Sequence, residues 1–368
     1  MVWTLVIAVG LLALVGMILL WPNGDSNDSS EFLDSNIRKA RVLLVEQLPC
    51  TGTAPEEGVD CRWVTISVGD EDDRGVIEQS ADGVGARLKE GDRILVSTAV
   101  IGNGTIVYGF HDYQRGTPML LLALIFVISV LLLGRWRGLG AVAGLGASLI
   151  VLIIFLLPSL LDGNSPIAVA IVGSIVIAFI AIFLAHGINI ASAVALLSTF
   201  LSLTLTGLLG WLFVAAAKFT GYSDESSYYL DVLGLDIDFR GVILAGIVIG
   251  SLGVLDDVTV TQVSAVWQLR AANPNGSWSD IFRAAMTIGR DHVSSTVNTL
   301  FLAYAGASLP LLLFFSQSRQ STGAVIGKEV VAVEVVRSLV GSVGLVASVP
   351  IATALAATVV GAHREKHT

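Results

Sequence analysis

Charged residues and cysteines are scarce in this sequence, and the motifs of several large protein classes are missing. Only 14% of the 368 residues are Asp, Glu, Lys or Arg, whereas soluble domains carry about 25%, so an ordinary soluble protein is excluded. The net charge is −9 and no basic stripe occurs, so nucleic acid is not expected as a partner. The sequence contains no Gly-rich nucleotide loop and no HExxH motif, and we therefore expect neither an enzyme nor a bound cofactor. Clusters of His and Cys, which would indicate zinc or copper, are also missing, and we predict no metal centre.

Long apolar runs dominate the chain instead. Hydrophobic residues make up 54% of it, and a membrane-crossing helix needs about 20 consecutive apolar residues. These properties predict a polytopic α-helical membrane protein whose first partner is the lipid bilayer. We expect about eight transmembrane helices, at residues 2–21, 118–134, 139–161, 165–185, 190–217, 241–268, 294–316 and 338–361.

The amino-terminal third divides into an anchor, a linker and a small domain. Residues 1–21 lack a basic start and end at Trp21-Pro22 without a small-residue cleavage site, which favours a retained transmembrane anchor over a cleaved signal peptide. Residues 22–40 are polar and acidic and indicate a linker. In residues 41–116, short β-rich runs alternate with turn residues, which predicts an extracytoplasmic all-β domain, OB-like or a small barrel. Residues 117–368 then form a seven-helix transmembrane domain.

Cysteine positions and basic residues suggest how the chain is oriented. Cys50 and Cys61, the two cysteines of the chain, favour a disulfide in an oxidising compartment over a two-ligand metal site. With residues 22–117 placed outside the cytoplasm, the "GRWRG" loop, the segment around Arg270, Arg283 and Arg290, and the carboxyl-terminal tail all fall inside. Because basic loops prefer the cytoplasm, we expect both termini to be cytoplasmic.

Two adjacent acids, Asp256 and Asp257, lie within the apolar run 241–268. A central Asp costs about 2.5–3.5 kcal/mol on insertion scales, and both desolvation and a like-charged neighbour favour the protonated form. We therefore expect the two acids to titrate as a coupled pair. Adjacent helical positions diverge by about 100°, which directs Asp256 toward another helix or a helix end. Asp257 falls instead on a polar stripe with Thr261, Ser264 and Gln268.

The alternative role for the two acids is structural. If Gly253 breaks the helix, they cap its second half, where a helix amino terminus favours negative charge.

A second set of polar residues begins the next span. Asp291, Ser295 and Asn298 share one helical face, and Ser294, Thr299 and Tyr304 add hydrogen-bonding groups. Arg290 and Asp291 are expected at the cytoplasmic interface. The two polar stripes satisfy each other if their helices face, either as a substrate pathway or only as interhelical hydrogen bonds.

An acid and a base precede the last span. Glu334 and Arg337 are spaced i, i+3, and we expect an ion pair between them at the outer surface.

Three of these segments resemble the YibE/F-like family of bacterial membrane proteins: "GSLGVLDDVTVTQVSAVWQL", "GRDHVSSTVNTLFLAYAGASLPLLLFF" and "EVVRSLVGSVGLVASVPIATALAA". The resemblance covers about residues 118–361, and it implies a multi-pass protein of the bacterial cytoplasmic membrane with a β-rich ectodomain.

A more distant likeness concerns mechanism. An aspartate-bearing span followed by a "TVNTL" span is similar to the proton-conducting helices of SecDF and of resistance-nodulation-division permeases. This likeness implies Asp256 or Asp257 as proton carrier, with Asn298 and Thr299 as the opposing wall.

Two functions remain open from the sequence. The first is a proton-coupled secondary transporter or exporter of a small ion or solute, working as a homodimer and coupled through Asp256 and Asp257. The alternative is a non-transporting scaffold or envelope-assembly component whose ectodomain binds a partner. An intramembrane aspartic protease is disfavoured, because adjacent acids on one helix cannot both face a scissile bond.

Overall fold

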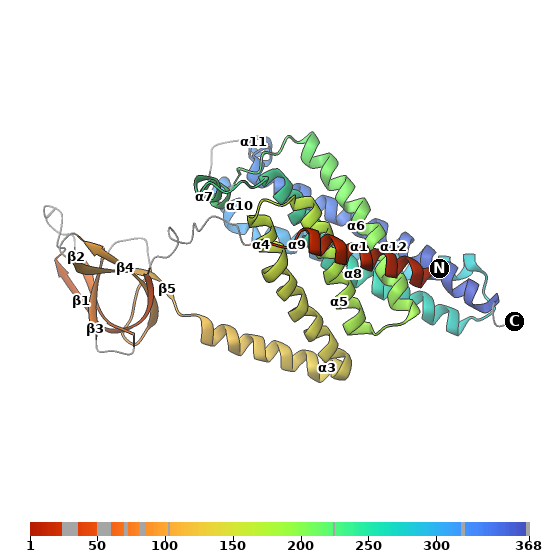
Figure 1. Cartoon of the computed structure of the whole chain (residues 1–368), viewed down its shortest axis with the longest axis horizontal. Helices are drawn as coiled ribbons and strands as arrows, with labels where there is room; N and C mark the ends of the chain where they lie inside the picture. Colours follow the sequence, from red (N-terminus) through yellow and green to blue (C-terminus); the bar gives the residue numbers. More distant parts are fainter. Residues whose placement is uncertain are drawn as a thin grey trace. The chain divides into compact units, whose positions relative to one another are not determined.

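A computed structural model describes residues 1–23, 36–49, 60–69, 73–80, 86–101, 104–223, 225–317 and 321–365. The chain separates into two compact units (Figure 1). One contains the β-rich segment and the chain through Ser129, and the other contains the amino-terminal helix and the chain from Val130 onward. The membrane-spanning helices dominate the second unit, so the predicted class, a polytopic helical membrane protein with a small β-rich region, is confirmed.

The β-rich unit is a single antiparallel sheet of five strands in the order β3-β2-β1-β4-β5. The strands match the five β-rich runs of the sequence. Alternate side chains such as Val64, Ile66, Ile94 and Val96 are fully buried on one face, where they form the core of this unit. The strands are β1 (Asn36–Pro49), β2 (Asp60–Val68), β3 (Asp73–Ser80), β4 (Arg93–Ile101) and β5 (Thr105–Tyr113).

The two edges of this sheet are brought together by Tyr108 of β5. Its hydroxyl donates to Asp73 Oδ2 of β3 at 3.2 Å, and a Cβ at Gly75 would lie 2.5 Å from its ring. Burial raises the pKa of the Tyr108 hydroxyl, and the charge of Asp73 adds to this effect. Gly75 therefore gives the aromatic ring room to close the sheet on itself.

The predicted linker and the predicted disulfide both concern the ends of strands in this unit. Strand β1 begins at Asn36, inside the range that the sequence predicts as linker. Cys61 is buried at the start of β2, whereas Cys50 lies outside the described residues, so the disulfide stays a prediction.

The helices follow the apolar runs of the sequence closely. Caps fix several boundaries: Asn189 accepts from Ser192 N–H at 2.9 Å at the start of α6, and Gly187, with φ 79°, ends α5. The helices of this half of the chain are α1 (Val2–Leu19), α3 (Gly116–Val151), a π-helical turn (Leu152–Leu156), α4 (Leu157–Leu161), α5 (Pro166–His186), α6 (Ile190–Ala216), α7 (Glu225–Val232), α8 (Phe239–Ala272), α9 (Trp278–Ala307), α10 (Leu309–Ser316), α11 (Thr322–Ile326) and α12 (Glu329–Glu365).

Two interruptions determine how many times the chain crosses the membrane. Helix α3 is broken at Arg135, with φ 49° and ψ −126°, inside the predicted "GRWRG" loop. Helices α9 and α10 meet at a bend of 63°, where Pro310 cannot donate a backbone hydrogen bond. By length and composition the described chain holds six membrane-spanning helices, or seven if α9 and α10 form one span. The predicted count of eight, which treats the two arms of α3 separately, stays a prediction.

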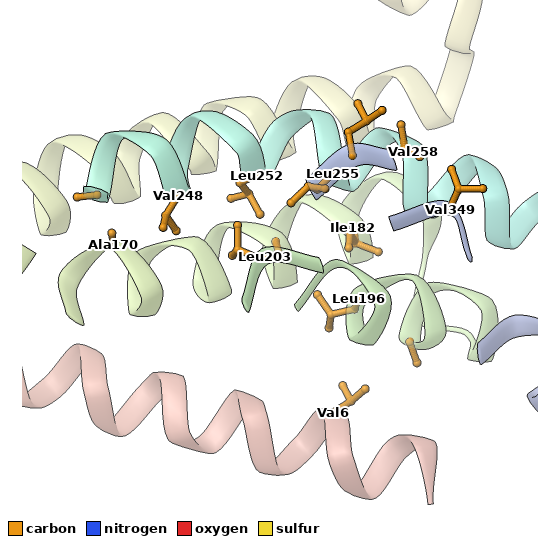
Figure 2. Packing of buried hydrophobic residues seen from close by; sticks show 14 of the residues in the cluster. Val6, Ala170, Ile182, Leu196, Leu203, Val248, Leu252, Leu255, Val258 and Val349 are labelled. Carbon is orange, nitrogen blue, oxygen red and sulfur yellow. The ribbon is translucent and has the colours of Figure 1, made fainter. Parts of the chain in front are cut away.

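Small residues allow the helices to pack closely. In lipid the hydrophobic effect does not drive helices together, so close packing and hydrogen bonds hold a bundle together. The main apolar cluster joins α1, α5, α6, α8 and α12, and Figure 2 shows Ile182, Leu196, Leu203, Leu252 and Leu255 converging in it. At Gly344 of α12, an added Cβ would collide with the Thr206 side chain of α6.

We expect Gly344→Ala to destabilise the bundle by about 1–3 kcal/mol, because the collision with Thr206 forces α6 and α12 apart. Gly361→Ala, on the same helix but with open space around the added methyl, should be neutral or slightly stabilising. Thermal unfolding of both variants in detergent checks this. Equal melting temperatures for the two would contradict it.

Candidate functional site

Helix α8 lies at the centre of the bundle and carries both predicted acids. It runs without a break from Phe239 to Ala272, and the Asp238 carboxylate caps its start by accepting from Gly241 N–H at 2.9 Å. The helix is continuous through Gly253. The alternative in which Asp256 and Asp257 cap a second half-helix is therefore wrong, because no helix end exists there.

The two acids occupy different environments, as their spacing predicts. The Asp257 side chain is exposed on the outer face of α8, whereas Asp256 is partly buried. The Oδ1 atom of Asp256 is fully buried and has no hydrogen-bond partner among the described residues. A buried carboxylate oxygen without a partner is costly when the group is charged.

A small polar cavity of about 210 Å³ lies along α8 near Asp256. Val260, Val263 and Trp267 of α8 line it, and they share a helical face with Asp256 at i, i+4, i+7 and i+11. Asp256 is thus one turn beyond the cavity on the face that the cavity follows. The remaining lining residues come from the α3 break, the α5–α6 turn and α6, with one further residue from α8: Arg137, His186, Asn189, Ala191, Ser192, Ala195 and Ser264.

The mouth of this cavity carries charge. His186 interacts electrostatically with Arg137 and with Asp257, so Asp257, although exposed, belongs to the same electrostatic cluster. Asp256 in turn interacts with Asp257. Four titratable or charged side chains from α3, α5 and α8 are therefore linked in sequence from the cavity mouth to the buried Asp256.

A second polar cluster lies on the other side of Asp256 along α8. Glu334 and Arg337 of α12 form the predicted ion pair at 2.8 Å, and Tyr304 of α9 interacts electrostatically with both. The Tyr304 hydroxyl lies 2.9 Å from the position of a Cβ at Gly250. Since α8 rises 1.5 Å per residue, this cluster is about 9 Å from the level of Asp256. The pair is partly buried, with 26% and 29% of its side chains exposed, rather than at an open outer surface.

Hydrogen bonds between buried side chains hold the helices around α8. Thr199 of α6 and Thr259 of α8 are 2.6 Å apart at their hydroxyls. Gln262 Nε2 donates to Thr353 Oγ1 of α12 and to the Ala285 carbonyl of α9, each at 2.8 Å. These contacts, the polar seam of the bundle, connect α6, α8, α9 and α12.

The two polar stripes do not face each other, so the condition under which the sequence has them satisfy each other is not met. Thr261, Ser264 and Gln268 lie with Asp257 on an exposed face of α8, and Asp291, Ser295, Asn298 and Thr299 are likewise exposed on α9. The two helices meet instead through Gln262 and the small residues Ala285 and Gly289. Small residues permit the close approach, and this close contact turns both stripes outward.

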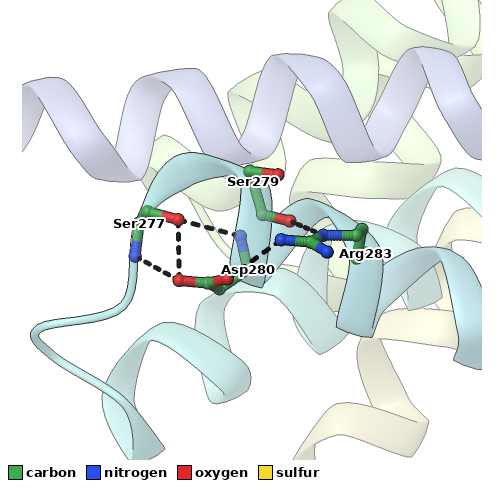
Figure 3. Close-up of polar contacts among 4 residues, drawn as sticks. All are labelled: Ser277, Ser279, Asp280 and Arg283. Atoms are coloured by element: carbon green, nitrogen blue, oxygen red, sulfur yellow. Dashed lines mark hydrogen bonds and ion pairs between the residues drawn. The ribbon is translucent and has the colours of Figure 1, made fainter.

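Helix α9 starts earlier than the sequence predicts. A capping box at Ser277 and Asp280 begins it, with Ser277 Oγ donating to Asp280 Oδ2 at 2.7 Å and Asp280 N–H donating back to Ser277 Oγ at 3.2 Å (Figure 3). Arg283 pairs with Asp280 at 3.3 Å one turn later. The predicted span 294–316 is therefore the second half of α9 together with α10, and Arg290 lies within a helix.

Metal ligands and a second cavity are the remaining candidates for a site. No group of three or more His, Cys, Asp or Glu in the described ranges could hold a metal ion. A larger cavity of about 470 Å³ between α1, α5, α6 and α8 is lined by apolar side chains and Thr204, so it offers no titratable group.

The polar seam yields a direct test of stability. We expect Gln262→Leu to destabilise the protein by about 1–3 kcal/mol, because Thr353 and the contact between α8 and α9 lose their donor. Gln268→Leu, the same change on an exposed position of the same helix, should have little effect. Melting temperatures in detergent measure the difference, and equal losses would show that the seam does not stabilise the bundle.

Comparison with known proteins gives one family match. No curated protein and no solved structure matches this chain. Residues 122–362, from the first arm of α3 to the end of α12, match the YibE/F-like protein family. Because the match covers well over half of the sequence and includes every residue of the site, the chain belongs to the YibE/F-like family.

Proposed function

We propose that this protein is a proton-coupled secondary transporter of the bacterial cytoplasmic membrane, moving a small ion or solute. The observation that supports it is the Asp256 carboxyl group, which has a buried oxygen without a hydrogen-bond partner in the described bundle. Such a group binds a proton to remove its charge and releases it when water reaches it. Transporters exploit intramembrane acids in this way.

The cavity beside α8 is the proposed proton entrance from the cytoplasm. In the proposed topology residues 22–117 are extracytoplasmic and both termini are cytoplasmic, so the α5–α6 turn faces the cytoplasm. His186 and Arg137 at the mouth and the cavity along Val260 and Val263 lead toward the face of Asp256. Histidine exchanges protons near neutral pH, and Asp257 beside it completes the relay.

The cluster of Tyr304, Glu334 and Arg337 is the proposed exit. It lies on the extracytoplasmic side of Asp256 along α8 and contains two groups that can accept or donate a proton. The Arg337 guanidinium, whose Nε is buried without a hydrogen-bond partner among the described residues, is placed to bind an anionic substrate. Entrance, carrier and exit thus follow one helix.

Proton flux into liposomes containing the purified protein tests this proposal. Asp256→Asn should lower the flux at least tenfold, because an amide cannot carry the proton, and Asp256→Glu should retain part of it. Asp236→Asn, which removes an exposed acid outside the membrane helices, is the matched control and should behave as wild type.

Infrared spectroscopy detects protonation of carboxyl groups directly, so it tests the proposal without a known substrate. The carboxylic-acid carbonyl band that appears on acidification should lose a component in Asp256→Asn that Asp236→Asn retains. Unchanged flux and an unchanged band in Asp256→Asn/Asp257→Asn would rule out the coupling role.

A scaffold function is the second candidate, and the β-rich unit carries the observation that favours it. Val100 and Ile106 are exposed apolar residues paired across strands β4 and β5, and Ile101 and Val107 are exposed on the opposite face of the same strands. Exposed apolar side chains grouped in this way are a feature of interaction sites. The strand order, with β3 and β5 brought together, supports the expected OB-like barrel, a fold that often binds partners.

We expect the double variant Val100→Ser/Ile101→Ser to lose any crosslink between this unit and an envelope partner, while Val76→Ser, on the exposed side of β3, retains it. Crosslinking in intact cells measures the effect. Proton flux should be unchanged in both variants. A crosslink that survives the double substitution would place the partner elsewhere.

A further inference from the structure

Helix α9 presents a polar face that the bundle leaves uncovered. Its outward side carries five exposed residues within nine positions: Arg290, Asp291, Ser294, Ser295 and Asn298. The opposite side of α9 packs against α8 and α12, through Gly289 beside Gln262 and Val349, and through Leu300 beside Gly341. The polar face therefore points away from α8 and α12.

If α9 and α10 together form one membrane span, Asn298 of this face falls near the middle of the bilayer. Along the antiparallel pair of helices, Gly289 is opposite Gln262 and Tyr304 is opposite Gly250, so Asn298 is level with about Asp256. Asp256 is close to the midpoint of the 34-residue helix α8, whose central 20 residues suffice to cross the hydrocarbon layer. Arg290, near the level of Gln262, lies closer to one membrane surface.

The hydrogen-bonding needs of this face are met only in part. The Ser294 hydroxyl donates to the Arg290 carbonyl at 3.0 Å, as serines on a helix can. The Asn298 carboxamide, with two donor hydrogens and an acceptor oxygen, makes no hydrogen bond within the described part of the chain, and neither Arg290 nor Asp291 has an ion-pair partner there. Lipid tails cannot supply these bonds, so another polar surface must cover the face.

We propose that a second copy of this chain covers the polar face of α9, which makes the protein a homodimer. Two copies insert into the membrane in the same orientation, so a twofold axis along the membrane normal sets α9 parallel to its counterpart at equal depth. Asn298 then meets the second copy's Asn298, and two carboxamides can satisfy each other. Arg290 approaches the second copy's Asp291, and the small serines allow the backbones to come close. The face is thus complementary to itself, which favours a second copy as its partner.

Cysteine crosslinking in native membranes tests this interface. Asn298→Cys should form an oxidation-induced dimer in high yield. Leu201→Cys is the matched control, because Leu201 is 55% exposed on α6 at a similar depth, and it should form at most a trace of dimer. Wild-type protein, which keeps Cys50 and Cys61, gives the background.

A second measurement separates loss of association from loss of folding. Counting subunits by single-molecule photobleaching in bilayers should show wild-type dimers, a roughly 5- to 30-fold weaker dimerisation for Asn298→Leu, as expected for a lost interhelical amide bond, and recovery with Asn298→Gln. Helix content and melting of the monomer should be preserved.

The result does not depend on proton transport, since a dimer of a non-transporting protein would give the same data. A monomeric wild type, or equal crosslinking at positions 298 and 201, would overturn the proposal. So would crosslinking of Asn298→Cys to a different protein.

Discussion

Water is absent from the hydrocarbon core of a membrane, so every polar group on these helices must find its hydrogen bonds within protein or line a wet cavity. The helices around α8 meet this constraint with short contacts between side chains. Thr199 bonds to Thr259, and Gln262 reaches both α9 and α12. These bonds bury one face each of α6, α8, α9 and α12. The other polar residues of α8 and α9 then lie on the opposite, exposed faces.

Against this background, Asp256 and the outward polar faces stand out as two different exceptions. One carboxylate oxygen of the partly buried Asp256 is enclosed by the bundle without a hydrogen-bond partner among the described residues, which makes a charge on this group depend on access of water. The faces of α8 and α9 are open, which makes them depend on something outside this chain. The enclosed carboxylate oxygen is the basis of the proposed titrating role. The exposed polar face of α9 is the basis of the proposed interface.

Local features of the sequence predict much of this fold. Apolar runs locate the membrane helices, the "GRWRG" loop locates the break in α3 at Arg135, and alternating β-rich runs locate five strands, because each of these signals comes from neighbouring residues. Periodicity also groups Asp257 with Thr261, Ser264 and Gln268, but it does not tell which face of a helix is buried. The sequence leaves open whether this stripe faces α9, and in the structure it faces outward.

Contacts between distant residues are the part that periodicity cannot supply. Gln262 and Thr353 are separated by 91 positions, and nothing local indicates that they meet. Small residues such as Ala285 and Gly289 mark where α9 approaches α8, and they were the available signal for the true contact. The cavity at His186 combines α3, α5, α6 and α8, so it emerges only once the helices are packed.

The continuity of α8 limits how any cargo can be recognised. Many transporters unwind a helix halfway across the bilayer and use the freed carbonyls and amides as ligands. Here the peptide groups around Asp256 are all engaged in helical bonding, so none is available to replace the hydration shell of an ion. In the proposed transporter, ion selectivity must then come from side chains alone.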